Sequence, residues 1–306
     1  MTELGNPELI RLLACPDCGR DLFELDTLLQ CTHCGREYEI RDGIPLLYPK
    51  TMDIGRLRGE EILAEMMKRP RSSRRNRLSS HQWENSKKEF WGMVRGKVSP
   101  PPKCFVNIGC GYDACFNEFQ EVGHLFVNFD IVYRMLHALQ RDFHAMSCVA
   151  GDLNSLPFKK GCFDYVVCVD VLHHESDKVC TLLQSFRDLL KPGGLLFLED
   201  VNAWGMFQFP KSLFLPRAAH RLLRSAYHQL KRSVHEPAYY EFPTNVYRVR
   251  KILRDLNFSH ISIHPNSAYP CIGPLSYRAY SCLSRIESVR QYHNYHYMLS
   301  ATKRGG

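Results

Sequence analysis

The stretch 103–113 constrains the fold more than any other part of the chain. Its first part, Cys104–Ile108, is a short apolar run after the breaker Pro100-Pro101-Pro102, and it predicts a buried strand. The run ends in Gly109-Cys110-Gly111, where two glycines one residue apart let the backbone turn tightly and approach a ligand. Helix-like spacing follows over 113–122, so backbone N–H groups of the loop are expected to face a ligand above the sheet edge. The stretch therefore predicts the start of a nucleotide-type site.

Short apolar runs alternate with helix-length segments after this stretch, which is typical of a mostly parallel sheet with crossover helices. Helices are expected over 182–190 and 249–256, the first of them stopped by Lys191-Pro-Gly-Gly194. Further strands are expected over 125–129, 147–150, 163–169, 195–201, 261–263 and 295–302. The sequence therefore predicts an α/β fold.

Acidic residues follow three of the expected strands. Asp130 ends the second strand, where a carboxylate is well placed to accept hydrogen bonds from both hydroxyls of a ribose. Asp152 follows the third strand and is positioned to accept from an adenine amino group, while Leu153 packs on the ring. Asp170 follows the fourth strand. An acid after a strand is also a common helix N-cap, so the order of these residues carries more information than any one of them.

The order of the motifs resembles that of class I S-adenosylmethionine-dependent methyltransferases over residues 100–202. The motifs are Asn107-Ile-Gly-Cys-Gly111, Asp130, Gly151-Asp-Leu153, Phe163-Asp-Tyr-Val-Val167, Val171-Leu-His-His174 and Leu190-Lys-Pro-Gly-Gly194. The resemblance implies a Rossmann-like seven-stranded sheet with helices on both faces. It also implies S-adenosylmethionine as cofactor, held by Asn107, Gly109, Gly111, Asp130, Asp152, Leu153 and Asp170. Two residues depart from the family pattern: Asn107 replaces an acid, and Tyr112 replaces a residue that is often small.

A nicotinamide-dinucleotide site is the alternative interpretation of the glycine loop and Asp130. Its fingerprint places a third glycine where this chain has Ala114, which the looser form of the motif allows. The motifs at 171–174 and 190–194 have no place in that fingerprint, so they favour the methyltransferase interpretation.

Two Cys-x-x-Cys motifs stand near the N-terminus, with twelve residues between them. They are Cys15-Pro-Asp-Cys18 and Cys31-Thr-His-Cys34, and each precedes a glycine. Four thiolates in this arrangement can close a tetrahedral Zn²⁺ site with no open position, which makes the metal structural. A pair of redox-active motifs is the alternative. His33 is expected to be a solvated loop residue, because four cysteines already complete the site.

The pattern from Cys15 through Asp42-Gly-Ile-Pro-Leu-Leu47 resembles the small zinc-ribbon activator subunit of tRNA, rRNA and release-factor methyltransferases. The resemblance implies that the ribbon stabilises the catalytic domain in cis. We therefore expect a zinc ribbon over 1–50, a basic linker and a helix over 51–99, and a methyltransferase domain over 100–306. The helix carries Trp83, Phe90 and Trp91, and a lid-like insertion is expected at about 202–241.

Composition limits the compartment and the partners. Thirteen cysteines, an odd number, are awkward as a disulfide framework and indicate reduced thiols with some metal ligation. No apolar run approaches the roughly 18 residues that cross a bilayer, and no signal-peptide segment is visible, so a cytoplasmic protein is expected. The net charge of +8 permits contact with RNA or anionic lipid. The arginine-rich run 68–77 is either an RNA-binding arm or a solvated linker. The sequence predicts no oligomeric state.

Methyl transfer needs an acceptor in line with the methyl and usually a base for its proton. His173 and His174 are the candidate bases, although they could instead only orient the loop. Tyr239, Tyr240 and Glu241 are weaker candidates for acceptor contacts, and the loop 270–274 is expected near the acceptor pocket. An aromatic lid and a His-His loop suit a closed pocket, so a small-molecule or lipid-like acceptor is expected. The alternatives are an RNA or translation-related substrate, and a non-catalytic scaffold.

Overall fold

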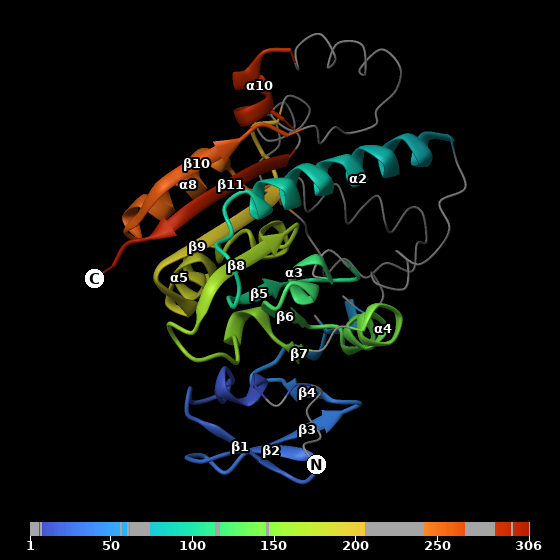
Figure 1. The fold of residues 1–306 in the computed structure, drawn as a ribbon, viewed down its shortest axis with the longest axis vertical. Coiled ribbons are helices and arrows are strands. Elements are labelled where there is room, and N and C mark those ends of the chain that lie inside the picture. The colour runs from blue at the N-terminus through green and yellow to red at the C-terminus, as the bar shows by residue number, and fades with distance from the viewer. Residues whose placement is uncertain are drawn as a thin grey trace.

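One mixed sheet of 11 strands runs through the protein, in the order β1-β2-β3-β4-β7-β6-β5-β8-β9-β11-β10 (Figure 1). The computed structural model describes residues 6, 8–55, 57–59, 61, 74–113, 117–144, 147–205, 242–266, 285–294 and 296–305. The expected α/β class is confirmed. The sheet is larger than expected, because the N-terminal segment adds strands to it.

The seven strands β5 to β11 form the part of the sheet that the motif series predicts. Parallel pairing holds β7, β6, β5, β8 and β9 together, and β11 runs antiparallel to both β9 and β10. The strands are β5 Cys104–Ile108, β6 Leu125–Asp130, β7 Cys148–Gly151, β8 Phe163–Val169, β9 Leu190–Val201, β10 Phe258–His264 and β11 His296–Lys303. Because the parallel strands share a direction, their carboxyl ends meet at one edge, where ligands of such sheets bind.

Helices cover both faces of this part of the sheet (Figure 1). On one face lie α2 (Arg74–Arg95), α3 (Asn117–Glu121) and α4 (Tyr133–Phe143), and on the other lie α5 (Val179–Leu189) and α8 (Val246–Asp255). Further short helices that lie wholly within the described residues are η1 (Leu9–Arg11), η3 (Leu153–Ser155), η4 (Leu172–Glu175) and α10 (Glu287–Tyr292). Phe90 and Trp91 of α2 are fully buried, which confirms that the helix before β5 packs on the core.

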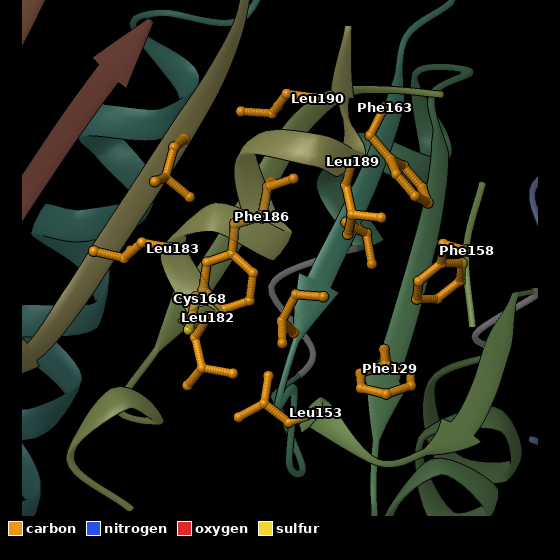
Figure 2. Close-up of a cluster of buried hydrophobic side chains, with 14 of the residues drawn as sticks. Phe129, Leu153, Phe158, Phe163, Cys168, Leu182, Leu183, Phe186, Leu189 and Leu190 are labelled. Atoms are coloured by element: carbon orange, nitrogen blue, oxygen red, sulfur yellow. The ribbon is translucent and has the colours of Figure 1, made fainter. Parts of the chain in front are cut away.

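Two hydrophobic cores follow from the alternation of side chains along the strands. In β5, Cys104, Val106 and Ile108 join the core under α5 and α8, whereas Phe105 joins the core under α2 to α4. Figure 2 shows part of the first core, in which the aromatic rings of Phe129, Phe158, Phe163 and Phe186 pack with leucines from α5. Fully burying a side chain of this size contributes about 1.5–3 kcal/mol, so these contacts fix the positions of the strand ends.

The N-terminal segment folds as an antiparallel sheet that continues directly into the larger one. Its strands are β1 Leu22–Leu25, β2 Leu28–Cys31, β3 Glu37–Arg41 and β4 Ile44–Leu47. Parallel pairing joins β4 to β7, with Leu46 opposite Ala150 and Leu47 opposite Gly151. A Cβ at Gly151 would lie 2.9 Å from the Phe129 ring and 3.0 Å from the Leu47 carbonyl oxygen, so only glycine fits this junction. The four N-terminal strands are therefore an extension of the sheet.

The end of α5 differs from expectation. The helix ends at Leu189, and the segment 190–194 lies inside β9, where Leu190 pairs with Phe163 before the register shifts. A Cβ on Gly194 would lie 2.9 Å from the Asp164 carbonyl oxygen, which explains the glycine in a strand that bends. The breaker sequence stops the helix as expected and then takes part in the sheet.

Several expectations fall outside the described residues. They are the lid-like insertion from residue 206 to 241, which includes Tyr239, Tyr240 and Glu241, most of the arginine-rich run, and the loop 270–274. Within the ranges given above, no helix combines the length and apolar character that crossing a membrane requires.

Candidate functional site

The loop after β5 has the tight geometry that its glycines predict. Gly109 and Gly111 have φ of +68° and +55°, in the left-handed region that other residues seldom adopt. The N–H groups of Gly109 and Cys110 both donate to the carbonyl oxygen of Phe129, at 2.8 and 3.1 Å. A Cβ on Gly109 would lie only 2.3 Å from a methyl group of Val171, whereas one on Gly111 would meet nothing within 4 Å. The loop is closed on the β8 side and open at Gly111.

Asp130 lies at the end of β6 and is fixed against the glycine loop. Its two carboxylate oxygens accept from the N–H groups of Gly111 and Val132, both at 2.8 Å. A carboxylate oxygen carries two lone pairs, so one backbone hydrogen bond does not saturate it. The loop and Asp130 therefore lie in contact, and two backbone N–H groups orient the acid.

Asn107 supplies a polar group below the loop. Its side chain is buried, and its Oδ1 atom has no hydrogen-bond partner among the described residues. Asn128 lies opposite it on β6 and is also buried with both side-chain polar atoms unpaired within the described part of the chain. A buried unpaired amide costs about 1–3 kcal/mol, so the two side chains favour a polar ligand or water at this position.

Asp152 and Leu153 occupy the end of β7. The Asp152 carboxylate accepts from the N–H of Asn154 at 2.8 Å and so caps η3, which is the alternative role that the sequence allowed. Leu153 is nearly buried at the start of η3. The helix cap holds both residues at the same sheet edge as Asp130.

His173 forms a buried pair with an acid that the sequence analysis did not single out. Its Nδ1 lies 2.6 Å from Oδ1 of Asp200, whose side chain is fully buried near the end of β9. The second Asp200 oxygen accepts from the Thr244 hydroxyl at 2.9 Å, and that hydroxyl lies 2.9 Å from the hydroxyl of Tyr297. Asp200 therefore fixes the orientation of the imidazole of His173.

His174 lies next to this pair on η4. Its ring centroid is 4.2 Å from that of His173, and its backbone N–H donates to the Val171 carbonyl at 3.1 Å. The structure thus brings both candidate bases to the end of β8, beside the glycine loop that Val171 contacts. Of the two, His173 is the one whose pairing with a buried carboxylate is described above.

Asp170 connects this pair to a second histidine. It has a φ of +60°, and its N–H donates to the Glu199 carbonyl at 2.8 Å. Its Oδ1 lies 3.8 Å from His173 Nδ1 and 3.9 Å from Nε2 of His296 on β11. Burial raises the pKa of Asp170, and the two imidazoles oppose that shift only in part.

His296 and Glu199 form the other end of the network. Nδ1 of His296 lies 3.3 Å from Oε1 of Glu199, and the same oxygen accepts from the Ser86 hydroxyl of α2 at 2.7 Å. Burial disfavours the charged imidazole, but the bond to Glu199 and the nearby Asp170 outweigh it and raise the pKa of His296. We call the five titratable residues Asp170, His173, Glu199, Asp200 and His296 the edge cluster.

Sequence reasoning missed Glu199, Asp200, Thr244 and His296. Two adjacent acids near the end of an expected strand were the available signal, because that strand ends at the same edge as Asp130 and Asp170. His296 gave no comparable signal. It reaches the edge because β11 runs antiparallel to β9, with His296 opposite Val201. Thr244 reaches it through a bridge to Asn202 after β9.

The four N-terminal cysteines form a separate cluster with the geometry of a metal site. Their Sγ atoms all lie within 4.8 Å of one another, and the pairs Cys15–Cys34 and Cys18–Cys31 are 3.8 and 3.5 Å apart. Tetrahedral zinc with bonds of about 2.3 Å places its sulfur ligands about 3.8 Å apart, so the donor set fits Zn²⁺. Burial by itself would raise the pKa of the Cys31 thiol. Hydrogen bonds from the backbone N–H groups of Cys34 and His33 outweigh this effect and lower the pKa to about 7.

Comparisons with known proteins agree with the fold and the glycine loop. Residues 106–198 match the family model described as "Methyltransferase domain". Ubiquinone biosynthesis O-methyltransferase from Xanthomonas campestris pv. campestris (strain B100) is 26% identical over 114 residues, 36% of this chain and 47% of that protein. The enzyme of the same name from Haemophilus ducreyi is 28% identical over 109 residues, 33% of this chain and 46% of that protein. The chain spans about half the length of the curated relatives it matches.

A solved structure shares the fold. A putative S-adenosylmethionine-dependent methyltransferase from Listeria monocytogenes has a TM-score of 0.50 and 13% identity, covering 72% of this chain and 100% of that one. The family match identifies a methyltransferase domain over residues 106–198, and this likeness shows the same fold. The residues present fit a nucleoside cofactor, because the buried Asn107 oxygen has no partner among the described residues and the Asp130 carboxylate is oriented beside Gly111, where the backbone is open.

Proposed function

We propose that the protein transfers a methyl group from S-adenosylmethionine to a hydroxyl oxygen of a small-molecule or lipid-like acceptor. The buried His173–Asp200 pair carries the proposal, because it is a positioned base beside the cofactor loop. The O-methyltransferase relatives support oxygen as the methylated atom.

In this proposal the cofactor lies along the edge formed by β5, β6 and β7. Asn107 and the open backbone at Gly111 adjoin its methionine part, Asp130 accepts from the ribose, and Asp152 with Leu153 flanks the adenine. When bound, S-adenosylmethionine supplies a methyl group on a sulfonium, which the acceptor oxygen attacks as the carbon–sulfur bond breaks. Val171 restricts the β8 side of the loop, where it faces Gly109.

His173 removes the proton of the acceptor hydroxyl. In the tautomer that donates Nδ1–H to Asp200, the lone pair of the imidazole lies on Nε2 and accepts that proton. Asp200 then stabilises the imidazolium, and Thr244 keeps the carboxylate in place through its other oxygen. Leu172, which directly precedes His173, is buried in the core under α5 and α8 and so holds η4 against the sheet.

The N-terminal cysteines bind one structural Zn²⁺ in this proposal. The four sulfurs complete a tetrahedral shell, so the metal has no open position for a substrate. Its function is to hold β1 to β4 in the shape that pairs with β7.

The test measures methyl transfer and cofactor binding separately. Methyl-labelled S-adenosylmethionine is incubated with the full-length protein and fractionated cell extract, and the label is followed into organic-soluble, RNA and protein pools. We expect label in the organic-soluble pool, and about a 100-fold or greater rate loss in His173→Asn with cofactor affinity by calorimetry unchanged.

His144→Asn is the matched control, because His144 is exposed at the end of α4 and Asn tolerates its φ of +53°. Label entering RNA instead would overturn the acceptor class. A His173→Asn variant with the wild-type transfer rate would overturn the assignment of the base. A protein that fails to bind S-adenosylmethionine would overturn the proposal as a whole.

A further inference from the structure

The edge cluster carries more negative charge than its histidines balance. Asp170, Glu199 and Asp200 are three carboxylates, and the ion pairs they make within the described ranges are all with His173 or His296. Even with both imidazoles protonated, one negative charge is left over. Burying an uncompensated carboxylate is costly, so the cluster favours a cation at its centre.

Three members of the cluster offer ligand atoms at the spacing of a metal site. One atom each from Asp170, His173 and Asp200 lies within 4.8 Å of the other two. The three residues come from the end of β8, from η4 and from β9, so the sheet edge itself brings them together. A site supplied by separate packed elements is formed before a cation binds, which lowers the entropic cost of binding.

Unpaired buried oxygens independently indicate a ligand. The Oδ1 atom of Asp170 is buried, has no hydrogen-bond partner among the described residues, and lies 3.8 and 3.9 Å from the two imidazoles. Oε2 of Glu199 is also buried, on a side chain that is 1% exposed, and it too has no partner in the described ranges. Each carboxylate therefore keeps one buried oxygen without a hydrogen bond among the described residues.

We propose that Asp170, His173 and Asp200 form a binding site for a divalent cation of the Mn²⁺ type. Two carboxylate oxygens and one imidazole nitrogen combine a hard oxygen set with a borderline nitrogen, which suits Mn²⁺ better than a thiol-preferring metal. Glu199 contacts His296, whose Nε2 lies 3.9 Å from Asp170, so these two residues help to fix the position of Asp170. The cysteine cluster is chemically distinct, because four sulfurs favour Zn²⁺.

Cation binding and base catalysis by His173 exclude each other in one molecule. A cation at Nδ1 requires the tautomer with its proton on Nε2, and that nitrogen then has no lone pair for an acceptor proton. Cation binding is measured without S-adenosylmethionine or acceptor. A protein that binds no cation would therefore leave the methyltransferase proposal intact, and a protein that transfers no methyl group would leave the cation site intact.

The experiment titrates Mn²⁺ into the zinc-loaded full-length protein and follows free Mn²⁺ by electron paramagnetic resonance. We expect one Mn²⁺ per chain, with at least about 10-fold weaker binding in Asp170→Asn. Asparagine has the same shape and tolerates the φ of +60° at this position, so the variant should fold. Asp255→Asn is the matched control, because Asp255 is an exposed acid on α8.

Asp200→Asn gives a second measurement, with circular dichroism as the check on folding. Loss of Mn²⁺ binding in both Asp170→Asn and Asp200→Asn, with wild-type binding in Asp255→Asn, supports the site. Wild-type protein that holds no stoichiometric Mn²⁺ would overturn it. So would binding that folded Asp170→Asn retains at full strength, since the cation would then lie elsewhere.

Discussion

At the scale of single residues, His296 shows how the protein keeps charge inside its core. The imidazole is 2% exposed, which by itself disfavours protonation. The raised pKa shows that the carboxylates of Glu199, Asp170 and Asp200 outweigh burial. Since the folded pKa exceeds the unfolded value of 6.5, the folded state binds a proton more tightly than the unfolded chain does.

The sign of this shift predicts a pH-dependent stability. His296→Gln should destabilise the protein by about 3 kcal/mol below pH 6.5, because it breaks a buried ion pair. The contribution is fully present below the unfolded pKa and is lost as pH rises through the higher folded pKa, so the difference from wild type should shrink with rising pH. Urea unfolding of both proteins between pH 5.5 and 8.5 measures it. A constant difference over that range would contradict a charged His296.

At the scale of elements, the end of β4 contacts the loop that carries Asp130. The Tyr48 hydroxyl donates to the Ile131 carbonyl at 2.9 Å, one residue after the acid assigned to the ribose. Burial, with the nearby Asp130 charge, raises the pKa of Tyr48, so this hydroxyl remains a donor. Tyr133 of α4 donates to Asp42 between β3 and β4, which adds a second contact between the same elements.

Tyr48→Phe should therefore weaken S-adenosylmethionine binding. Removing one hydrogen bond that orients the loop costs about 1 kcal/mol, or roughly fivefold in affinity. Isothermal titration calorimetry measures the effect, and Tyr247→Phe on α8 is the control because that ring packs against Trp204 and Tyr292. Unchanged affinity in Tyr48→Phe would show that β4 does not support the cofactor site.

The elements also show how far sequence reasoning reaches. β5 and β8 have the predicted bounds, because an apolar run between breakers is a local signal. The glycine loop and Asp130, which the resemblance assigned to one cofactor, lie in contact because neighbouring parallel strands end together. The β4–β7 pairing and the His296 contacts were not predicted, since they join segments far apart in the chain and leave no local pattern.

At the scale of the whole molecule, the ribbon and the methyltransferase domain share one core. Leu9, Leu13, Leu29 and Leu47 pack in the same buried cluster as the strands and as helix α5. Backbone hydrogen bonds from Ala14 to Pro157 and from Lys159 to Leu12 tie the two parts together. The Ser155 hydroxyl also donates to the Pro16 carbonyl, beside the first cysteine motif. A continuous core of this kind favours unfolding as one cooperative unit.

Zinc loss should then destabilise the entire chain. Cys31→Ser removes one of four ligands, and structural zinc contributes a folding free energy that can reach about 10 kcal/mol in small sites. Because each kcal/mol shifts the melting temperature of a large domain by about 2–4 °C, we expect a fall of at least about 10 °C. Elemental analysis should find one zinc per chain in the wild type and little in the variant, with Cys180→Ser, an exposed thiol outside the site, as the control.

The shape of the transition decides between a shared core and two independent parts. With the shared core, calorimetry of Cys31→Ser should show a single transition at the lower temperature, because β4 cannot stay paired with β7 once β1 to β3 lose their shape. Two transitions, with the larger one at the wild-type temperature, would show that the methyltransferase sheet is stable without the ribbon. Wild-type zinc content in Cys31→Ser would instead refute the metal site, whatever the melting temperature.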